Sequence, residues 1–313
     1  MNFWLLDRQH KEVQTDLDRA YERVARSGQF ILGKENKDCE GMMQKMFGVK
    51  HVILTSSGTQ ALEIVLRDSP HLYWQVPSVS FIATENAVIN TKSEFGGHGF
   101  DDPVLSVDLY GLPAPAGEVR DSCQAHNLAL MKLLPGDSKA AVLSFFPTKA
   151  VGALGDAGAI LTNDKSLADD YRKLRDQGRA THEESVGVGT NARCDELQAA
   201  FIKVKLARFP RWQTRRTEIC KKWDEVTGYN HGKWGPYLYP VWSEERDKIQ
   251  QVLADKGVPS KVYYREPLDP TEKAVNFCNK VLCLNPDPFL TDAEVYAIQY
   301  ALSVETFIER PEL

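Results

Sequence analysis

The chain has 313 residues, of which 42% are hydrophobic and 26% are charged, a composition typical of soluble globular proteins. Its 38 Lys and Arg stand against 43 Asp and Glu, a formal net charge of −5. Because no Lys/Arg-rich run offers a surface for phosphates, a nucleic-acid-binding protein is excluded as the leading class. The length exceeds the needs of one small core, so we expect a large domain over residues 1–208 and a smaller one over 209–313.

The sequence shows no sign of membrane insertion, export or metal binding. No stretch approaches the roughly 18 to 20 consecutive apolar residues of a membrane-spanning helix, and residues 1–8 do not resemble a signal peptide. The six cysteines are scattered, and neither a Cys-x-x-Cys nor a His-x-x-x-His pair occurs. We therefore expect a soluble cytoplasmic protein with reduced thiols, no membrane partner and no metal site.

The first two thirds of the chain alternate between helix and strand patterns. Apolar residues from Val13 to Val24 recur at helical spacing and predict an amphipathic helix that ends near Gly28. Beyond it, runs rich in β-branched residues predict strands at 51–55, 73–76, 104–107, 140–143 and 157–161. Helices are expected at 60–67, 84–89 and 167–177. This alternation predicts an α/β fold in which helices sandwich a mostly parallel sheet.

The last third has a different texture. A long helix is expected after Asn191, although Pro210 should kink or break it. After Gly228 the chain is rich in loops, with helices expected at 244–256, 271–279 and 291–307 and a strand at 261–264. These elements predict a smaller C-terminal α+β domain.

Two segments place polar groups where a ligand could bind. Residues 55–60, Thr-Ser-Ser-Gly-Thr-Gln, lie between a strand and a helix, where free backbone N–H groups and the helix dipole favour a phosphate. The same residue types also serve as plain helix caps. Residues 119–126 bring Asp121 to a strand end, at the sheet edge where ligands bind, although an Asp there can equally form a turn.

A third segment, residues 144–152, carries Lys149 among aromatic, Pro and Gly residues directly after an apolar strand. Burial lowers the pKa of a lysine, and a Schiff-base catalyst needs a neutral amine. The side chain could instead be ion-paired or extend to solvent. A phosphate turn followed by an Asp and then a Lys is the order typical of a pyridoxal phosphate (PLP) site.

Five motifs in this order resemble the DegT/StrS family of sugar aminotransferases, which has the aspartate-aminotransferase-like fold, fold type I. They lie at residues 57–62, 76–84, 121–126, 144–149 and 191–200, with further likeness at 27–33 and 290–295. The resemblance runs nearly end to end. It departs at residues 90–120, a segment shorter than is usual in the family, and at Ser122-Cys123, where alanines are more usual. Cys123 is expected to serve in packing rather than in redox chemistry.

The resemblance implies a role for each matching residue. Lys149 would bind PLP covalently, and Asp121 would pair with its ring nitrogen. The other cofactor-binding residues would be Phe81 stacked on the ring, Gln124 beside the ring hydroxyl, Gly58, Thr59 and Ser144 at the phosphate, and Asn191 at the phosphate bound by the other subunit of a homodimer.

The activity that the resemblance implies is transfer of an amino group from an amino acid, with L-glutamate the expected donor, to a nucleotide-linked keto sugar. Two alternatives stay open: a PLP enzyme acting on another ketone, such as a cyclitol, and a non-catalytic regulatory relative of the same fold. The dehydratase branch of the family has histidine in place of the lysine, so Lys149 argues against dehydration.

Overall fold

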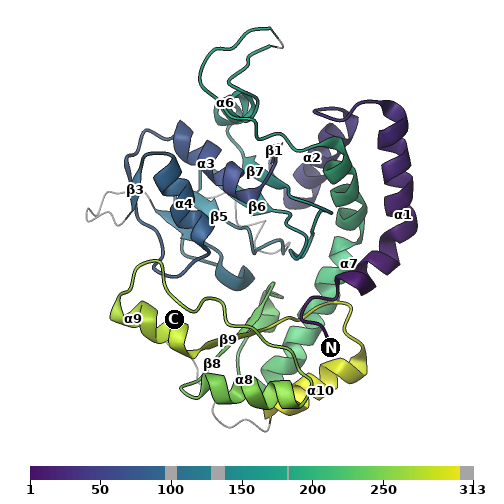
Figure 1. The fold of residues 1–313 in the computed structure, drawn as a ribbon, viewed down its shortest axis with the longest axis vertical. Coiled ribbons are helices and arrows are strands. Elements are labelled where there is room, and N and C mark those ends of the chain that lie inside the picture. Colours follow the sequence, from purple (N-terminus) through teal and green to yellow (C-terminus); the bar gives the residue numbers. More distant parts are fainter. Residues whose placement is uncertain (96–103, 128–137, 182, 304–313) are drawn as a thin grey trace.

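The computed structural model describes residues 1–95, 104–127, 138–181 and 183–303. Its central sheet has five strands, in the spatial order β1 (His51–Thr55), β7 (Gly158–Thr162), β6 (Ala140–Ser144), β5 (Val119–Asp121) and β4 (Leu105–Val107) (Figure 1). Only β7 runs against its neighbours. The other four strands share one direction, so the prediction of a mostly parallel sheet is confirmed.

The edge of the sheet next to β4 is thin. Strands β2 (Tyr73–Trp74) and β3 (Glu94–Phe95) pair in parallel as a separate ribbon, and a single bridge between Gln75 and Val104 joins it to the main sheet. The strand expected at 73–76 is therefore shorter than predicted. Part of the shortened 90–120 segment, residues 96–103, lies outside the described residues.

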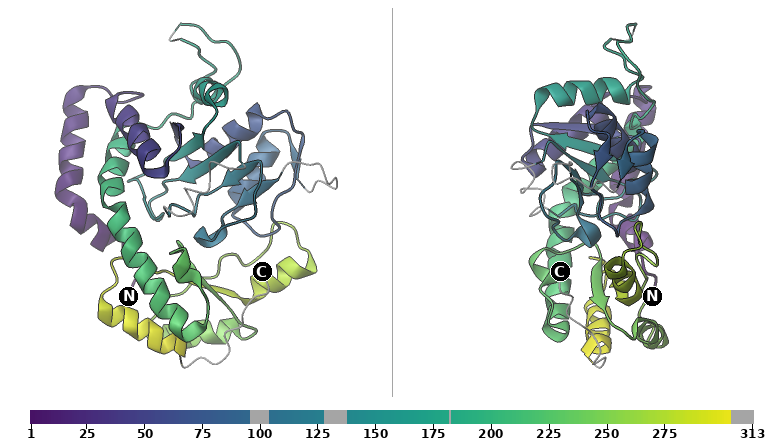
Figure 2. Two further views of the ribbon diagram at one scale, coloured as in Figure 1. Left: turned by 180° about the vertical axis from the view of Figure 1, so that it is seen from behind. Right: turned by 90° about the vertical axis from the view of Figure 1, so that its left-hand side faces the viewer.

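Helices cover both faces of the sheet, as predicted (Figure 2). On one face, α2 (Lys34–Phe47) and the first half of α7 (Glu196–Thr227) pack side chains such as Phe47 and Ile202 against Leu54 and Leu143. On the other face lie α3 (Gly58–Asp68), α4 (Ile82–Asn90) and α6 (Lys165–Arg175). The result is a three-layer α/β core.

Helix α1 (Leu6–Ser27) lies outside this core along α7 (Figure 1). Its buried stripe of Val13, Leu17, Ala20 and Val24 packs against α7, as its helical spacing predicts. Gly28 has φ +64°, the left-handed conformation that commonly ends a helix, so the predicted end is confirmed.

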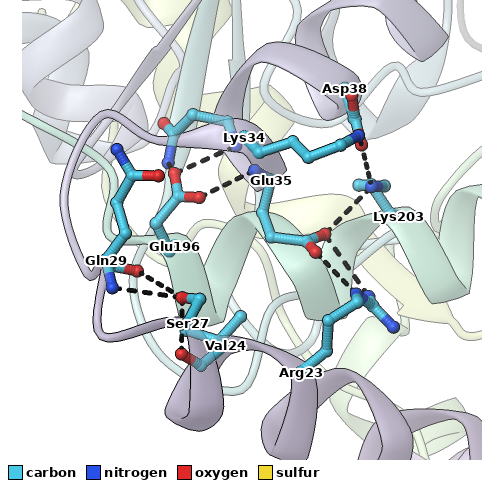
Figure 3. Close-up of polar contacts among 10 residues, drawn as sticks. Arg23, Val24, Ser27, Gln29, Lys34, Glu35, Asp38, Glu196 and Lys203 are labelled. Atoms are coloured by element: carbon cyan, nitrogen blue, oxygen red, sulfur yellow. Dashed lines mark hydrogen bonds and ion pairs between the residues drawn. The ribbon is translucent and has the colours of Figure 1, made fainter.

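The loop after α1 is fixed by a buried carboxylate (Figure 3). Glu196, at the start of α7, accepts hydrogen bonds from the backbone N–H groups of Gly33, Glu35 and Asn36 at 2.7, 2.7 and 3.1 Å. These donors open α2 and have no acceptor within that helix. Glu35 in turn accepts from Arg23 and Lys203, so α1, α2 and α7 are tied together. The sequence reading missed α2.

Helix α7 is continuous through Pro210, so the helix does not break there, and a kink at this residue stays a prediction. Pro210 is exposed, whereas Phe209 beside it is buried. Apolar side chains before the proline pack against the central sheet. After it, Ile219, Cys220 and Trp223 pack against two strands in the C-terminal part. This packing on both sides offsets the one backbone hydrogen bond that proline cannot make.

The C-terminal part is α+β, as predicted. Strands β8 (Tyr239–Trp242) and β9 (Val281–Leu284) form an antiparallel pair that the sequence reading missed. The helices around it are α8 (Arg246–Asp255), α9 (Glu272–Lys280) and α10 (Asp292–Ser303), close to their predicted positions. The predicted end of the last helix, at 307, lies outside the described residues. Because α7 runs through residue 208, the domain boundary stays a prediction.

The strand expected at 261–264 is wrong. Only Lys261 makes a bridge, to Cys283. Tyr263 and Tyr264 instead line a cavity between the sheet and the C-terminal part. Their side chains form part of the cavity lining, and their backbone does not pair with a neighbouring strand.

None of the described helices combines the length and the apolar character that a membrane crossing requires. All six cysteines are free thiols. Within the described ranges, no group of three or more His, Cys, Asp or Glu side chains could hold a metal ion.

Candidate active site

A cavity of about 400 Å³ opens where β1, β4, β5 and β6 end, a volume typical of small-molecule sites. Since these strands share a direction, the residues that follow them meet at one edge of the sheet. The cavity is lined by all but one of the predicted site residues: Gly58, Thr59, Phe81, Asp121, Gln124, Ser144 and Lys149. The exception is Asn191, which is exposed and bridges to Asp176 instead.

Lys149 lies in the turn that follows β6. Its backbone N–H donates to the carbonyl of Phe146 at 2.8 Å, and its Nζ lies 5.1 Å from the centroid of the Tyr237 ring. Burial lowers the pKa of Lys149, while the neighbouring Cys123 and Asp121 act in the opposite direction. The amine therefore loses its proton more readily than that of an exposed lysine, as a nucleophile or base requires.

Asp121 is the last residue of β5 and is buried. Its Oδ2 accepts a hydrogen bond from Thr84 Oγ1 at 3.0 Å, and its Oδ1 accepts one from the backbone N–H of Cys123 at 3.1 Å. The Thr84 hydroxyl lies 2.8 Å from that of Ser80. These contacts orient the carboxylate, which keeps further acceptor capacity toward the cavity. Thr84 closes one of the quoted motifs, although the sequence reading gave it no role.

Two fixed partners set the orientation of the Gln124 side chain. Its Oε1 accepts from the backbone N–H of Tyr110 at 2.7 Å, within the 3₁₀ turn η1 (Leu109–Gly111). Because a backbone N–H can only donate, the amide oxygen must face it. The amide nitrogen then donates one hydrogen to the hydroxyl of Tyr264 at 3.0 Å, and it carries a second hydrogen that can donate.

The start of α3 forms a narrow cradle. Ser57 caps the helix, since its Oγ accepts from the backbone N–H of Gln60 at 3.1 Å. The N–H groups of Gly58 and Thr59 precede the first intrahelical bonds. A Cβ at Gly58 would lie 2.8 Å from Ser144 Cβ and 2.9 Å from Cys123 Sγ. Only glycine fits there, and the backbone stays open to an anion.

The residues just described, Gly58, Asp121, Gln124, Ser144 and Lys149, form the sheet wall of the cavity. The opposite side, here called the aromatic wall, consists of Trp4, Tyr237, Tyr263 and Tyr264. No sequence motif pointed to this second wall, because its residues come from the N-terminal segment and from the C-terminal third. The sequence marks this wall only by two pairs of adjacent aromatic residues, Phe3-Trp4 and Tyr263-Tyr264.

Comparison with known proteins identifies the family to which these residues belong. The chain matches the DegT/DnrJ/EryC1/StrS aminotransferase family over residues 11–95 and 100–298. It belongs to this family. The predicted resemblance is thereby confirmed, and the gap in the match falls within the shortened segment.

Individual relatives agree with this assignment. The chain is 27% identical to the dTDP-3-amino-3,4,6-trideoxy-alpha-D-glucose transaminase of Streptomyces venezuelae, over 97% of this chain and 90% of that one. It is 32% identical to the erythromycin biosynthesis sensory transduction protein EryC1 of Saccharopolyspora erythraea, over 82% of each. The solved structure of S. venezuelae DesV with a ketimine intermediate is 26% identical, with a TM-score of 0.87 and 95% and 96% of the two chains covered.

Proposed function

We propose that this protein is a PLP-dependent aminotransferase of the cytoplasm that transfers an amino group from an amino acid to a nucleotide-linked keto sugar. The observation that carries the proposal is the meeting of Lys149, Asp121 and the Gly58 cradle in one cavity. Relatives named as transaminases of dTDP- and UDP-linked sugars support this acceptor class. L-Glutamate is the proposed donor.

The residues of the sheet wall fit the cofactor. The cradle, where a Cβ at Gly58 would crowd Ser144 and Cys123, suits a phosphate held by N–H groups and by the hydroxyls of Thr59 and Ser144. Asp121 would hold a proton on the ring nitrogen, and Gln124 offers a donor for the ring hydroxyl. Phe81, which also lines the cavity and is 54% exposed, would cover a ring face. When bound, PLP supplies an electron sink for carbanion chemistry.

Lys149 would act in two capacities. Its neutral amine would hold the cofactor covalently between turnovers, since a lowered pKa provides the nucleophile. Once free, the same amine would take the α proton from the bound donor and return it nearby, as base and then as acid.

The test is mass spectrometry of the purified protein incubated with PLP, L-glutamate and a panel of nucleotide-linked keto sugars. We expect one sugar to gain an amino group while glutamate becomes 2-oxoglutarate. Amination of a cyclitol ketone alone would change the acceptor class. Two relatives carry regulatory names, EryC1 and the pleiotropic regulatory protein of Geobacillus stearothermophilus. A protein that shows no absorption band from PLP would therefore support the non-catalytic alternative.

We further propose that the active unit is a homodimer with shared sites. Asn191 is exposed and does not line the cavity of its own chain, which suits a residue that serves the partner's phosphate. Large apolar side chains are also exposed beside the start of α7, at Phe30, Ile31 and Leu154, and in the cavity lining, at Phe146. A two-fold axis would bury such a patch on both subunits at once.

Subunit mixing tests the shared site. A mixture of Lys149→Ala and Asn191→Ala chains should form heterodimers in which one site carries both defects and the other carries none. Activity should then recover relative to either variant alone. If exchange is demonstrated without recovery, Asn191 acts within its own chain.

A further inference from the structure

The N-terminal segment, residues 2–5, reaches the cavity although it lies far from every motif. The Phe3 carbonyl accepts from Asn285 Nδ2 at 2.7 Å, and the Leu5 N–H donates to Asp287 Oδ2 at 3.3 Å. Phe3 and Leu5 are buried in two different apolar clusters. Between these anchors, Trp4 lines the cavity. The segment is thus held on both sides of Trp4.

Trp4, Tyr237 and Lys149 lie in series. The rings of Trp4 and Tyr237 are stacked, with centroids 5.3 Å apart and planes at 17°. The Nζ of Lys149 lies 5.1 Å from the Tyr237 centroid, within the distance at which an ammonium group is attracted to an aromatic ring. The Tyr237 hydroxyl is 3.3 Å from Thr148 Oγ1. The ring is therefore fixed at its edge by Thr148 and over its plane by Trp4.

We propose that Trp4 is a positioning residue for Lys149: by stacking on Tyr237 it holds that ring against the amine and so favours the protonated amine. The inference concerns the same site as the proposed function, in which Lys149 must hold a proton during part of the cycle. Burial disfavours the ammonium form of Lys149. The face of the Tyr237 ring partly replaces the lost hydration, and unlike a further carboxylate it does not hold the proton too tightly for transfer.

Other groups also act on this amine. Asp121 and Cys123 lie on one side and affect Lys149 electrostatically. The buried His126 interacts electrostatically with both Lys149 and Arg216. Arg216 also interacts with the Tyr237 phenol. A test must leave Asp121, Cys123, His126 and Arg216 unchanged, so the substitutions are confined to Trp4 and Tyr237, and Tyr237→Phe separates loss of the phenol from loss of the ring.

The experiment measures the protonation of Lys149 directly. The full-length, cofactor-free chain is acetylated with limiting acetic anhydride across a pH series, and the extent at Lys149 is read by peptide mass spectrometry. Tyr237→Leu keeps an apolar filling but removes the π face. A cation–π attraction of about 0.5 to 2 kcal/mol converts, at 1.36 kcal/mol per pH unit, to a downward shift of about 0.4 to 1.5 pH units.

Trp4→Leu should shift the pH midpoint of Lys149 acetylation in the same direction, but by less than Tyr237→Leu does. Trp4→Phe and Tyr237→Phe each keep an aromatic ring and should give the same acetylation profile as the wild-type protein. Lys139, an exposed lysine paired with Glu118, serves as the internal control in every sample. An upward shift in Trp4→Leu would mean that Trp4 merely excludes water, and an unchanged midpoint in Tyr237→Leu would mean that the ring does not act on the amine. Either result overturns the proposal.

The outcome is independent of the proposed function because no cofactor or substrate is present. If the midpoints shift as expected while PLP and glutamate produce no turnover, the positioning role stands and the aminotransferase proposal fails. If turnover occurs and the midpoints coincide, the reverse holds.

Discussion

The two walls of the cavity are built in different ways. On the sheet wall, Asp121 and Ser144 are the terminal residues of β5 and β6, and Gly58 opens α3 directly after β1. The aromatic wall joins Trp4 to Tyr237 across more than two hundred residues of sequence and has no strand-end geometry. One wall carries charge and hydrogen-bonding groups, and the other carries four large rings.

The sheet wall supplies the groups that would react with or bind the cofactor, and the aromatic wall supplies their surroundings. Groups that bind an anion or move a proton must be placed accurately, and strand ends in a rigid sheet provide that accuracy. Rings that exclude water and cover a ligand can come from loops, provided that those loops are anchored as residues 2–5 are. Substitutions on the sheet wall should therefore remove activity, whereas substitutions that loosen the aromatic wall should tune it.

The largest effect is expected for Lys149→Ala. This change removes the only cavity-lining amine among the described residues, so transamination should fall to background in a glutamate-dependent assay. The variant should keep its fold and bind PLP noncovalently through the phosphate cradle. Lys139→Ala, on the exposed surface, is the matched control and should retain wild-type turnover.

Asp121→Asn should rank second. The amide oxygen can still accept from the backbone N–H of Cys123, and the amide nitrogen can donate to the Thr84 hydroxyl. The fold should therefore persist, but an amide cannot stabilise a protonated ring nitrogen as a carboxylate does. A charge-assisted hydrogen bond is worth about 1.5 to 3 kcal/mol, which corresponds to a loss in kcat of roughly ten- to 160-fold. Near-normal kcat would show that this carboxylate serves only the strand end.

Gly58→Ala should weaken cofactor binding. The added Cβ would lie 2.8 Å from Ser144 Cβ, so the start of α3 and Ser144 must move apart, and the phosphate donors lose their alignment. The Kd for PLP, measured by titration, should rise, and the overpacking itself should lower stability by about 1 to 3 kcal/mol. Gly41→Ala in α2 is the control, since a Cβ there meets no atom within 4 Å. It should leave the Kd unchanged and raise stability by about 0.5 to 1 kcal/mol. Equal Kd values in both variants would remove Gly58 from the phosphate site.

The smallest effect concerns an ion pair that helps to anchor the aromatic wall. Arg8, just after the N-terminal segment, donates to Glu294 of α10 at 2.7 and 2.8 Å. These bonds and those from Thr291 lower the pKa of Glu294 to about 2. Because the folded pKa lies below the unfolded value, this stabilisation is present above pH 4.5 and is lost as the pH falls toward 2.

Glu294→Gln should therefore destabilise the protein by about 1 kcal/mol at pH 7, a value limited by the exposure of Arg8. Denaturant midpoints of the two proteins should converge as the pH approaches 2. A constant difference across this range would show that the carboxylate charge contributes nothing.

The sheet wall was predictable from the sequence because each of its residues belongs to a short segment in which strand, turn and helix signals coincide. Asp121 ends a short strand, Lys149 follows an apolar strand, and Gly58 opens a helix. Their meeting follows from the shared direction of the strands. Asn191 could be named only through the family resemblance, and its role stays a prediction.

The aromatic wall could not be predicted, because no local pattern encodes a contact between Trp4 and Tyr237. Tyr263 and Tyr264 even favoured a strand, since aromatic residues have high β-propensity. The break allowed for at Pro210 does not occur, for a related reason. A local rule forbids proline in a helix interior, whereas long-range packing on both sides of it decides the outcome.

The central claim is that Lys149 holds PLP and performs the proton transfer. Borohydride reduction of the PLP-loaded protein, followed by peptide mapping, tests it most directly. The account predicts a pyridoxyl label on the peptide that contains Lys149 and on no other, and loss of this label after incubation with glutamate before reduction. A label on a different lysine, or no label in a folded protein saturated with PLP, would contradict the account.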